Sequence, residues 1–415
     1  MQQIPKSAND LLRLVVASDL YDANRLKAYA QNLVANSLVP ADAMECAQLL
    51  ICDGLLTEYQ ARVLLQGGNQ KFTLGGKYRV LDLLGEGGMG TVYLCEHKHM
   101  RRRVAIKVLS NEKCQNPVLL DRFQKEARAV AMLNDPNIVR AHDVDWDGSV
   151  PFLVMEYVEG TNLQKLIEDN GRIHFLRCVN YMAQASSGLH HAHEVGLVHR
   201  DIKPANLLID RRGVLKILDL GLARLSTDHE VLGSSRDNSG LLGTADYLAP
   251  EQALNASQVD IRADIYSLGA TFYFLLAGQP PFPDGTVAQK LIKHQTTAPK
   301  PISQFDPEIP SGVCDVVMKM LAKKPEQRYS TPGDVFTALQ PWLTPISAPT
   351  DNELPGTRYS SHSDINLDTM ASVSVQDTLP LGFGPTSKFT RTMSSFELPA
   401  VKQTIPIRRG TLSSG

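Results

Sequence analysis

A change of pattern inside the stretch from about Tyr78 to Leu343 limits the folds open to this chain. Short runs rich in β-branched residues come first, and the rest of the stretch carries mainly helical periodicity. These runs cover residues 78–81, 91–94 and 104–108. Strands that are followed by helices, and do not alternate with them, are typical of α+β proteins. We therefore expect an α+β fold arranged in two lobes.

The first 72 residues predict a small helical module. Apolar residues recur there at helical spacing, as in Leu11, Leu12 and Val15, with polar residues between them. Residues whose side-chain oxygen can cap a helix stand near the starts of such runs: Asp10, Asp22, Asp42 and Thr57. No catalytic constellation is apparent in residues 1–72, so we interpret them as a packing or docking module.

The chain after Pro345 is rich in Ser, Thr and Pro, and its apolar residues show no period. Such a segment cannot bury enough apolar surface to offset the entropy lost on ordering. We therefore expect residues 345–415 to form a disordered tail.

Charge and hydropathy exclude several classes of protein. The 42 Lys and Arg residues and 44 Asp and Glu residues give a net charge of −2, so no large field points to nucleic acid or an acidic membrane as a partner. No apolar run approaches the roughly 18 residues needed to span a bilayer. The six cysteines contain no CxxC pair, and the N-terminus lacks the features of a signal peptide. We expect a cytoplasmic protein with reduced thiols and no membrane span.

A glycine-rich segment follows the first predicted strand and fits the pattern G-x-G-x-x-G-x-V: Gly85, Glu86, Gly87, Gly88, Met89, Gly90, Thr91 and Val92. Glycine lets backbone N–H groups approach phosphate closely and adopt unusual dihedral angles. A dinucleotide-binding turn would lead into a helix, but here residues 91–94 continue as a strand. The pattern alone also fits a simple tight turn, while its place between two strands favours a hairpin over phosphates.

A lysine lies among apolar neighbours in the strand-like run 104–108. Lys107 would point inward there, and a buried ammonium group needs a carboxylate or phosphate partner. Glu126, in the helical run 121–130, is the candidate partner. Taken singly, Lys107 also fits a surface strand position and Glu126 a solvated helix face.

Three further motifs follow in order: His199-Arg200-Asp201-Ile202-Lys203-Pro204-Ala205-Asn206, then Asp219-Leu220-Gly221, then Ala249-Pro250-Glu251. Together with the glycine-rich segment and Lys107, they have the order and spacing of protein kinase motifs. The stretch 78–343 therefore resembles the protein kinase family, specifically the bacterial eukaryotic-like (Hanks-type) serine/threonine kinases. The resemblance implies a small, mostly antiparallel β lobe with one helix, and a large, mostly helical lobe.

In this family the protein contributes positioning and electrostatics rather than covalent chemistry. The resemblance implies that Asp201 accepts and orients the substrate hydroxyl and that Lys203 neutralises the γ-phosphate. Lys107, held by Glu126, would bind the α- and β-phosphates of ATP. Thr244 would form a hydrogen bond near Asp201 and Lys203, which together with Pro204 matches the serine/threonine pattern.

The resemblance also implies a nucleotide and metal site. Asn206 and Asp219 would hold Mg²⁺, with Mn²⁺ as an alternative ion, because hard oxygen ligands suit these cations. Met155 would be the gatekeeper, Glu156 and Val158 would offer backbone hydrogen bonds to adenine, and Glu159 would lie near the ribose. The residues expected to contact ATP are Leu84, the glycine-rich segment from Gly85 to Val92, Ala105, Lys107, Met155, Glu156, Val158, Glu159 and Asn206.

Several other matched residues are interpreted as scaffold. Asp264 would brace the backbone of the catalytic loop, and Arg328 would pair with Glu251. A group of histidines precedes the catalytic loop, and we assign it packing and surface roles rather than metal binding: His190, His191 and His193, beside Glu194.

The tripeptide at Asp219 departs from the family pattern, because Leu220 stands where phenylalanine is usual; leucine still provides an apolar plug. Arg200 before Asp201 marks kinases whose activation segment is stabilised by phosphate. We therefore expect phosphorylation, including autophosphorylation, at one or more hydroxyl side chains of this segment: Thr227, Ser234, Ser235 and Ser239.

The resemblance implies protein substrates that carry Ser or Thr, and a dimer for phosphorylation of one copy by another. Residues 55–61, directly ahead of the catalytic stretch, are similar to those of kinases from planctomycete-like bacteria. For residues 1–72, docking of partners and packing on the small lobe are both open. The alternative function is a nucleotide-binding pseudokinase scaffold, which loss of Lys107, Asp201, Asn206 or Asp219 would favour; none is lost.

Overall fold

The computed structural model describes residues 4–68, 71–87, 90–220, 243–254, 259–345 and 348–350, without the side chains of Asn111, Glu112, Arg122 and Glu126. The chain divides into two compact units. Of these described residues, those up to 83 and those in 95–101 belong to the first unit, and the others belong to the second. The predicted tail, 345–415, falls almost wholly outside the described residues.

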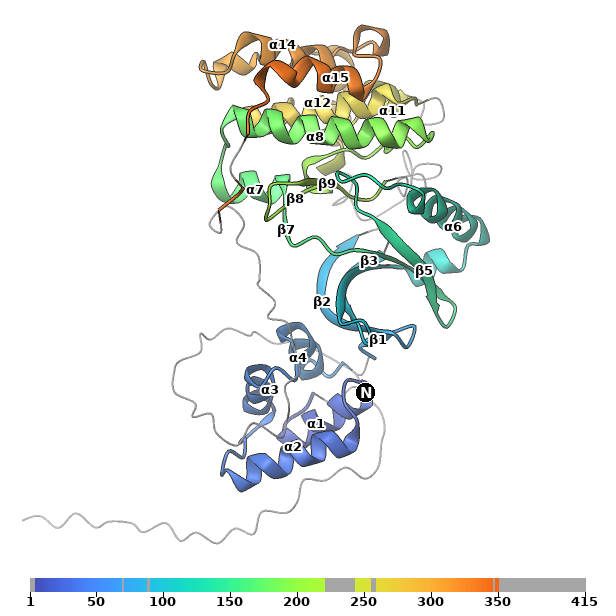
Figure 1. Ribbon diagram of the computed structural model, residues 1–415, viewed down its shortest axis with the longest axis vertical. Helices are drawn as coiled ribbons and strands as arrows, with labels where there is room; N and C mark the ends of the chain where they lie inside the picture. Colours follow the sequence, from blue (N-terminus) through green and yellow to red (C-terminus); the bar gives the residue numbers. More distant parts are fainter. Residues whose placement is uncertain are drawn as a thin grey trace, which may run out of the picture. The chain divides into compact units, whose positions relative to one another are not determined.

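The described part of the first unit begins with four helices, α1 (Ala8–Ala17), α2 (Ala23–Ala35), α3 (Ala43–Cys52) and α4 (Glu58–Leu65), as Figure 1 shows. Asp22, Asp42 and Thr57 are the N-caps of α2, α3 and α4, as predicted. The start of α1 differs, because Ser7 is its N-cap and Asp10 lies in its first turn. The two side chains form a capping box, in which each accepts a hydrogen bond from the backbone of the other.

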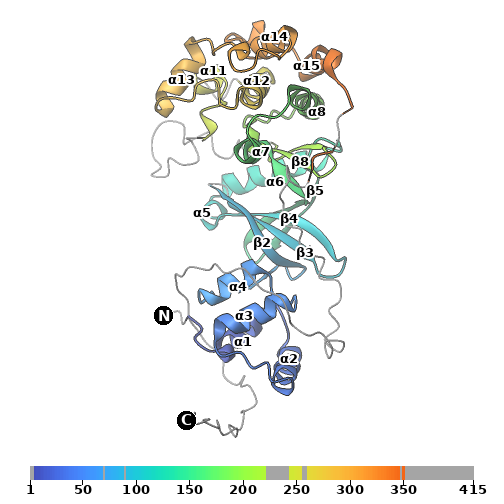
Figure 2. The same ribbon diagram turned by 90° about the vertical axis from the view of Figure 1, so that its left-hand side faces the viewer.

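One sheet has the strand order β1-β2-β3-β4-β6-β5. Its strands are β1 (Thr73–Leu74), β2 (Tyr78–Gly87), β3 (Gly90–His97), β4 (Arg102–Leu109), β5 (Ala141–Asp147) and β6 (Val150–Glu156). Figure 2 labels β2, β3, β4 and β5. The three strands predicted from β-branched runs are parts of β2, β3 and β4. The pairs β1–β2, β4–β6 and β5–β6 are antiparallel. Two helices follow β4, namely α5 (Asn111–Cys114) and α6 (Pro117–Ala131), and α6 packs against β5.

A second, smaller sheet and a helical lobe complete the second unit. The sheet is antiparallel, with β7 (Gly160–Asn162), β8 (Leu207–Asp210) and β9 (Leu215–Ile217) in that order. The helices are α7 (Leu163–Asn170), α8 (Phe175–Glu194), α11 (Pro250–Leu254), α12 (Arg262–Ala277), α13 (Val287–Thr296), α14 (Ser311–Met320) and α15 (Pro332–Leu339). Short 3₁₀ turns cover Pro204–Asn206, Ile302–Gln304, Pro325–Gln327 and Gln340–Trp342.

Helix α12 lies at the centre of the helical lobe. Every residue from Ala263 to Ala277 is buried, because α8 packs on one side of the helix and α14 on another (Figure 1). A helix that is apolar almost all round must be covered by neighbours in this way. This helix also carries Asp264, whose charged group is therefore held inside the lobe beneath the site described below.

A buried histidine in α13 makes stability depend on pH. The His294 side chain is buried, and its Nδ1 lies 2.8 Å from the Tyr266 hydroxyl. Burial and the nearby Lys323 ammonium lower the pKa of His294 to about 3. An unfolded histidine has a pKa of about 6.5, so the unfolded chain binds an extra proton between these two values, and the stabilisation is lost as the pH falls below about 6.5.

We expect His294 alone to lower the free energy of unfolding by about 2 kcal/mol when the pH falls from about 7 to about 5. Urea denaturation of the wild type and of His294→Gln at these two pH values measures the effect. The variant should show the smaller loss, because glutamine does not titrate. Equal losses in the two proteins would contradict the assignment.

Candidate active site

Lys107 lies on β4, opposite Leu153 of β6, and its side chain is buried. Its Nζ is 2.7 Å from Oδ1 of Asp219. A buried ammonium group needs an opposite charge, and here the carboxylate of the Asp-Leu-Gly motif supplies it. The predicted partner Glu126 belongs to α6, but its side chain lies outside the described part of the chain.

Asp201 is surrounded by residues of its own loop. Its Oδ2 lies 2.9 Å from Lys203 Nζ and accepts a hydrogen bond from Asn206 Nδ2 at 3.0 Å. The same Asn206 amide group donates to the backbone carbonyl of Asp201, which fixes the loop across the turn. Lys203 Nζ also donates to Thr244 Oγ1 at 2.9 Å, so the predicted contact between Thr244 and Lys203 is present.

The second carboxylate oxygen of Asp201 is different. Oδ1 is buried and has no hydrogen-bond partner among the described residues. Buried polar atoms are nearly always paired in folded proteins, so this acceptor is available to a hydrogen-bond donor from another molecule. A hydroxyl group brought to this oxygen would satisfy it.

Asp264 holds the catalytic loop from below. The backbone N–H groups of His199 and Arg200 donate to its two oxygens at 2.8 and 2.7 Å, and His193 Nε2 lies 2.8 Å from Oδ2. Burial alone raises the pKa of Asp264, but these hydrogen bonds and the nearby His199 outweigh it and lower that pKa below its ordinary value. The predicted bracing by Asp264 is thus observed. Arg200 has a positive φ of 67°, a conformation that this bracing maintains.

His199 joins the loop to the strand that leads to Asp219. Its Nδ1 accepts a hydrogen bond from the Asp201 backbone, so its Nε2 carries the proton and donates to the Leu218 carbonyl at 2.7 Å. The Leu218 N–H in turn donates to the Asn206 carbonyl at 2.9 Å. These bonds place Asn206 and Asp219, the two predicted metal ligands, on neighbouring backbone segments.

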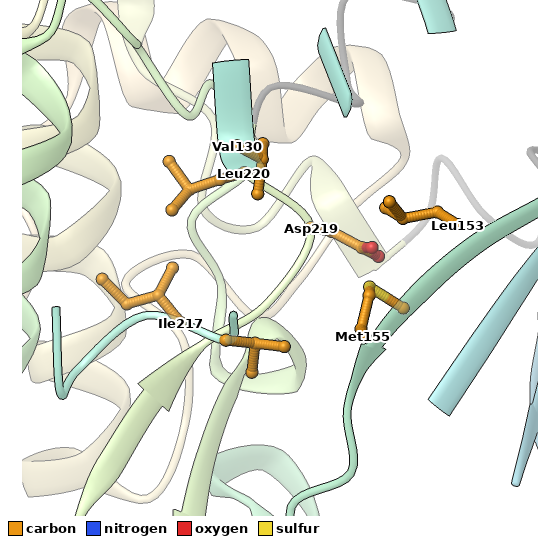
Figure 3. A pocket seen from close by; sticks show the side chains of 7 residues that line it. Val130, Leu153, Met155, Ile217, Asp219 and Leu220 are labelled. Atoms are coloured by element: carbon orange, nitrogen blue, oxygen red, sulfur yellow. The ribbon is translucent and has the colours of Figure 1, made fainter. Parts of the chain in front are cut away.

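The residue after Asp219 fills an apolar position, as predicted. Leu220 is buried and lines a small pocket beside Asp219, and Figure 3 shows these side chains. The other lining residues are Val130, Val139, Leu153, Met155 and Ile217. Gly221 and the predicted phosphorylation sites, Thr227, Ser234, Ser235 and Ser239, lie outside the described residues.

The glycine-rich segment forms the end of β2 and the start of β3. Gly90 has a positive φ of 143°, and a Cβ there would lie 2.0 Å from the Val108 carbonyl, so only glycine fits. Gly85 has no heavy atom within 4 Å of the place a Cβ would take. Leu84, Gly85 and Glu86 are exposed, whereas Gly88 and Met89 are outside the described residues. Open space at Gly85 and tight packing at Gly90 suit a hairpin anchored at one end.

The strand predicted to contact adenine is β6 with the residues that follow. Met155 pairs with Ala105 of β4 across the sheet, so both predicted contact residues are neighbours. The Glu156 N–H donates to the Arg140 carbonyl at 2.9 Å, which leaves its own carbonyl as the backbone group that it can offer to a base. Val158 is half-buried, as are Thr91 and Val92 of β3.

Ion pairs that the sequence does not reveal hold this segment. Lys216 of β9 lies 3.0 Å from Glu156 Oε2, and Arg211 lies 2.9 Å from Glu159 Oε1. The Glu159 carboxylate is thus already paired, and a ribose would share it with Arg211.

His193, which we assigned a packing role, is the third donor to Asp264. In each case the partners are far apart in sequence, and no local pattern indicates them.

Outside the site, Arg328 pairs with Glu251 through two hydrogen bonds of 2.6 and 2.8 Å, as predicted. No cluster of three or more His, Cys, Asp or Glu side chains with metal-binding geometry occurs in the described parts of the chain. His190 and His191 lie 3.8 Å from the Glu194 carboxylate at the end of α8, which agrees with a surface role.

The protein kinase domain family matches residues 78–341, well over half of the chain. The chain therefore belongs to the protein kinase family, and it has the fold of that family, with a curled antiparallel sheet and a helical lobe. The predicted fold class is confirmed. The crystal structure of the Mycobacterium tuberculosis PknI kinase domain matches with a TM-score of 0.50 and 26 % identity, over 65 % of this chain and 97 % of that one.

Among proteins of known sequence, a probable serine/threonine-protein kinase of Clostridium acetobutylicum is 35 % identical over 266 residues, which are 64 % of this chain and 40 % of the relative. Serine/threonine-protein kinase PknB of Mycolicibacterium smegmatis is 36 % identical over 266 residues, 63 % of this chain and 42 % of the relative. The chain thus spans less than half the length of these curated relatives. Both relatives are bacterial, which agrees with the predicted bacterial branch of the family.

Proposed function

We propose that this protein is an ATP- and Mg²⁺-dependent protein serine/threonine kinase. The observation that carries the proposal is the arrangement at Asp201, where one oxygen is paired with Lys203 and Asn206 and the other is buried without a partner. Asp201 Oδ1 is thus available to accept a hydrogen bond from a hydroxyl group. The Lys203 ammonium group lies beside the other oxygen and can face a phosphate. The names of the similar bacterial kinases support the same activity.

In the proposed reaction, Asp201 Oδ1 accepts the substrate hydroxyl and orients its oxygen toward the γ-phosphorus. The new bond forms from that oxygen to phosphorus while the bond to the bridging oxygen of the β-phosphate breaks, and ADP leaves. The hydroxyl proton passes to Asp201. Lys203 offsets charge on the γ-phosphoryl group, and its hydrogen bond to Thr244 fixes its direction. Lys107 binds the α- and β-phosphates.

The donor set fits a divalent cation. Asn206 uses its amide NH₂ group for Asp201, which leaves its amide oxygen as a ligand, and Asp219 supplies a carboxylate on the neighbouring segment. These are the hard oxygen ligands that Mg²⁺ or Mn²⁺ takes, and such an ion would supply charge neutralisation on the phosphates. Lys107 would exchange its contact with Asp219 for phosphate, with Glu126 as its predicted protein partner.

We assign the nucleotide to the space between the glycine-rich segment and β6. Gly85 and Gly87 would cover the phosphates, supported by Gly90 as the anchored end of the hairpin. Adenine would contact Leu84, Ala105 and Met155, and hydrogen bonds would come from the Glu156 carbonyl and the Val158 backbone. Ribose would lie near Glu159.

The remaining assignments concern the whole chain. We propose a helical module at 1–72, a catalytic domain at 78–343 and a Ser-, Thr- and Pro-rich tail at 345–415, with the planctomycete-like resemblance of the module as a further hypothesis. The protein would be cytoplasmic and its substrates would be proteins with Ser or Thr. In a dimer, one copy would phosphorylate the activation segment of the other. No helix in the described residues is both long enough and apolar enough to cross a membrane.

The proposal is tested by incubating the purified protein with γ-labelled ATP, Mg²⁺ and a generic basic protein, followed by phosphoamino-acid analysis. We expect label in phosphoserine and phosphothreonine, both on the substrate and on the kinase itself. A parallel reaction with EDTA should show no transfer. Nucleotide binding without label transfer would favour the pseudokinase scaffold, and label in phosphotyrosine would overturn the substrate class.

A further inference from the structure

The N-terminus of α4 is closed by a capping box. Gln60 N donates to Thr57 Oγ1 at 3.1 Å, and Thr57 N donates to Gln60 Oε1 at 3.0 Å. This pairing satisfies two backbone N–H groups that a helix start leaves without partners. Helix capping alone would explain Thr57 and Gln60 if their remaining polar atoms faced solvent.

The remaining polar atoms of Thr57 and Gln60 face β2 instead of solvent. Thr57 Oγ1 donates to the Leu81 carbonyl at 2.6 Å, and Gln60 Nε2 donates to the Val80 carbonyl at 2.5 Å. Gln60 is only 1 % exposed, and its side-chain amide binds the Thr57 N–H through its oxygen and the Val80 carbonyl through its nitrogen. The same two side chains therefore cap α4 and bind two consecutive carbonyls of β2.

Val80 and Leu81 lie on β2 at the point where the pairing with its neighbouring strand β1 ends. β1 pairs only with Tyr78 and Arg79, and the last backbone bond on that side runs from Val80 N to the Phe72 carbonyl at 2.9 Å. Beyond this bond, Gln60 supplies a donor to the Val80 carbonyl and Thr57 supplies one to the Leu81 carbonyl. Buried carbonyls without a donor would be costly, so these two side chains stabilise β2 where the pairing with β1 ends.

Other contacts of the helical module support the same stretch. Phe72 is fully buried, packs edge-on against Tyr59 of α4 and donates from its N–H to the Ser18 carbonyl at 3.1 Å. The Arg79 guanidinium lies 5.5 Å from the centre of the Tyr21 ring. Residues of α4 and of the connection between α1 and α2 thus hold the start of β2 and Phe72 beside it, within one compact unit.

β2 is a continuous strand that runs on to Gly87 and therefore carries the first glycines of the hairpin. At about 3.3 Å per residue, Leu81 and Gly85 are about 13 Å apart along this strand. The first glycines of the hairpin thus belong to the same strand whose Val80 and Leu81 carbonyls α4 binds.

We propose that Thr57 and Gln60 are positioning residues for the phosphate-covering hairpin, and that the helical module is a clamp on β2 rather than an independent docking domain. This inference rests on the proposed function, since ATP is the molecule that the hairpin covers. Loosening the clamp raises the fraction of molecules with a displaced hairpin. ATP binding then weakens, while the chemistry in bound complexes continues at its normal rate.

A substitution that keeps the helix cap and breaks only the contact with β2 tests the clamp. Aspartate is a good N-cap residue, but its carboxylate accepts hydrogen bonds and cannot donate to the Leu81 carbonyl. Thr57→Asp therefore separates the two roles of Thr57. Thr57→Ser keeps both the cap and the donor and is the matched control. Tyr21→Leu, which removes only the ring beside Arg79, is a second variant that leaves the capping box untouched.

For full-length Thr57→Asp we expect the KM for ATP to rise about fivefold, equivalent to the loss of about one hydrogen bond, with kcat within about twofold of wild type. Hydrogen exchange of the nucleotide-free protein should become faster in peptides covering 78–87. Thr57→Ser should behave as wild type, and Tyr21→Leu should change both readouts in the same direction by less.

A folded Thr57→Asp protein with unchanged KM and unchanged exchange in β2 would overturn the clamp. A lower kcat at constant KM would also overturn it, because that result indicates a smaller folded fraction and not a displaced hairpin. If Thr57→Asp does not fold, Tyr21→Leu with unchanged exchange in 78–87 counts against the proposal. Hydrogen exchange does not depend on kinase activity. If the wild-type protein has no kinase activity, the proposed function is wrong, and exchange in residues 78–87 still tests the clamp.

Discussion

Asp201→Asn is expected to lower kcat by about 10²–10⁴-fold while leaving ATP affinity nearly unchanged. Asparagine keeps the shape of the side chain, and its amide oxygen can still accept a hydrogen bond, but it cannot take the hydroxyl proton. The ion pair between Oδ2 and Lys203 Nζ is lost at the same time. Steady-state phosphorylation of a basic protein gives kcat, and a fluorescent ATP analogue gives the dissociation constant.

The matched control is Asp315→Asn, which makes the same chemical change on the exposed surface of α14. It should leave both constants unchanged. If Asp201→Asn instead weakens ATP binding and spares kcat, Asp201 acts on the nucleotide and our assignment of its role is wrong. If it retains full activity, the hydroxyl acceptor lies elsewhere.

Arg328→Leu is expected to lower the free energy of unfolding by about 3–5 kcal/mol, because it breaks a buried ion pair from one side. The Arg328 side chain is fully buried, and its guanidinium donates to both oxygens of Glu251 and to the carbonyls of Ala322, Arg262 and Lys323. Leucine leaves the three carbonyls and the carboxylate without these donors. Chemical denaturation of the full chain measures the change.

Two comparisons show whether burial is the cause. Arg328→Lys keeps the charge but loses the planar fork, so it should lose less stability than leucine. Arg101→Leu removes an arginine whose side chain is 58 % exposed from its pair with the half-buried Glu96, and ion pairs at the surface contribute about 1 kcal/mol or less. Similar losses for Arg328→Leu and Arg101→Leu would show that the buried network contributes little.

The sequence predicts the catalytic loop well because its chemistry is local. Asp201, Lys203 and Asn206 lie within six residues of one another, and the structure joins them by side-chain contacts. The contact from Lys203 to Thr244 is also present, although the two are distant in sequence, because both belong to motifs with fixed places in the fold.

Long-range partners are less accessible to sequence. The sequence predicts that Lys107 needs a carboxylate, and the structure brings Asp219 to it across two lobes of the catalytic domain. Nothing near Glu159 or Asp264 in the sequence indicates Arg211 or His193 as a partner. These contacts depend on how strands and helices pack, which periodicity does not specify.

Thr57 shows the difference between what the sequence predicts and what only the tertiary structure shows. By itself, the sequence determined that Thr57 caps a helix, that glycines and an inward lysine follow, and that the motifs are those of a kinase, since each of these depends on residue type and spacing over a few turns. Only the tertiary structure decided that the capping side chains also bind Val80 and Leu81 of β2, and that Asp201 keeps one oxygen unpaired. Both facts depend on which atoms of separate segments come within hydrogen-bond distance of one another, and the packing of those segments sets such distances.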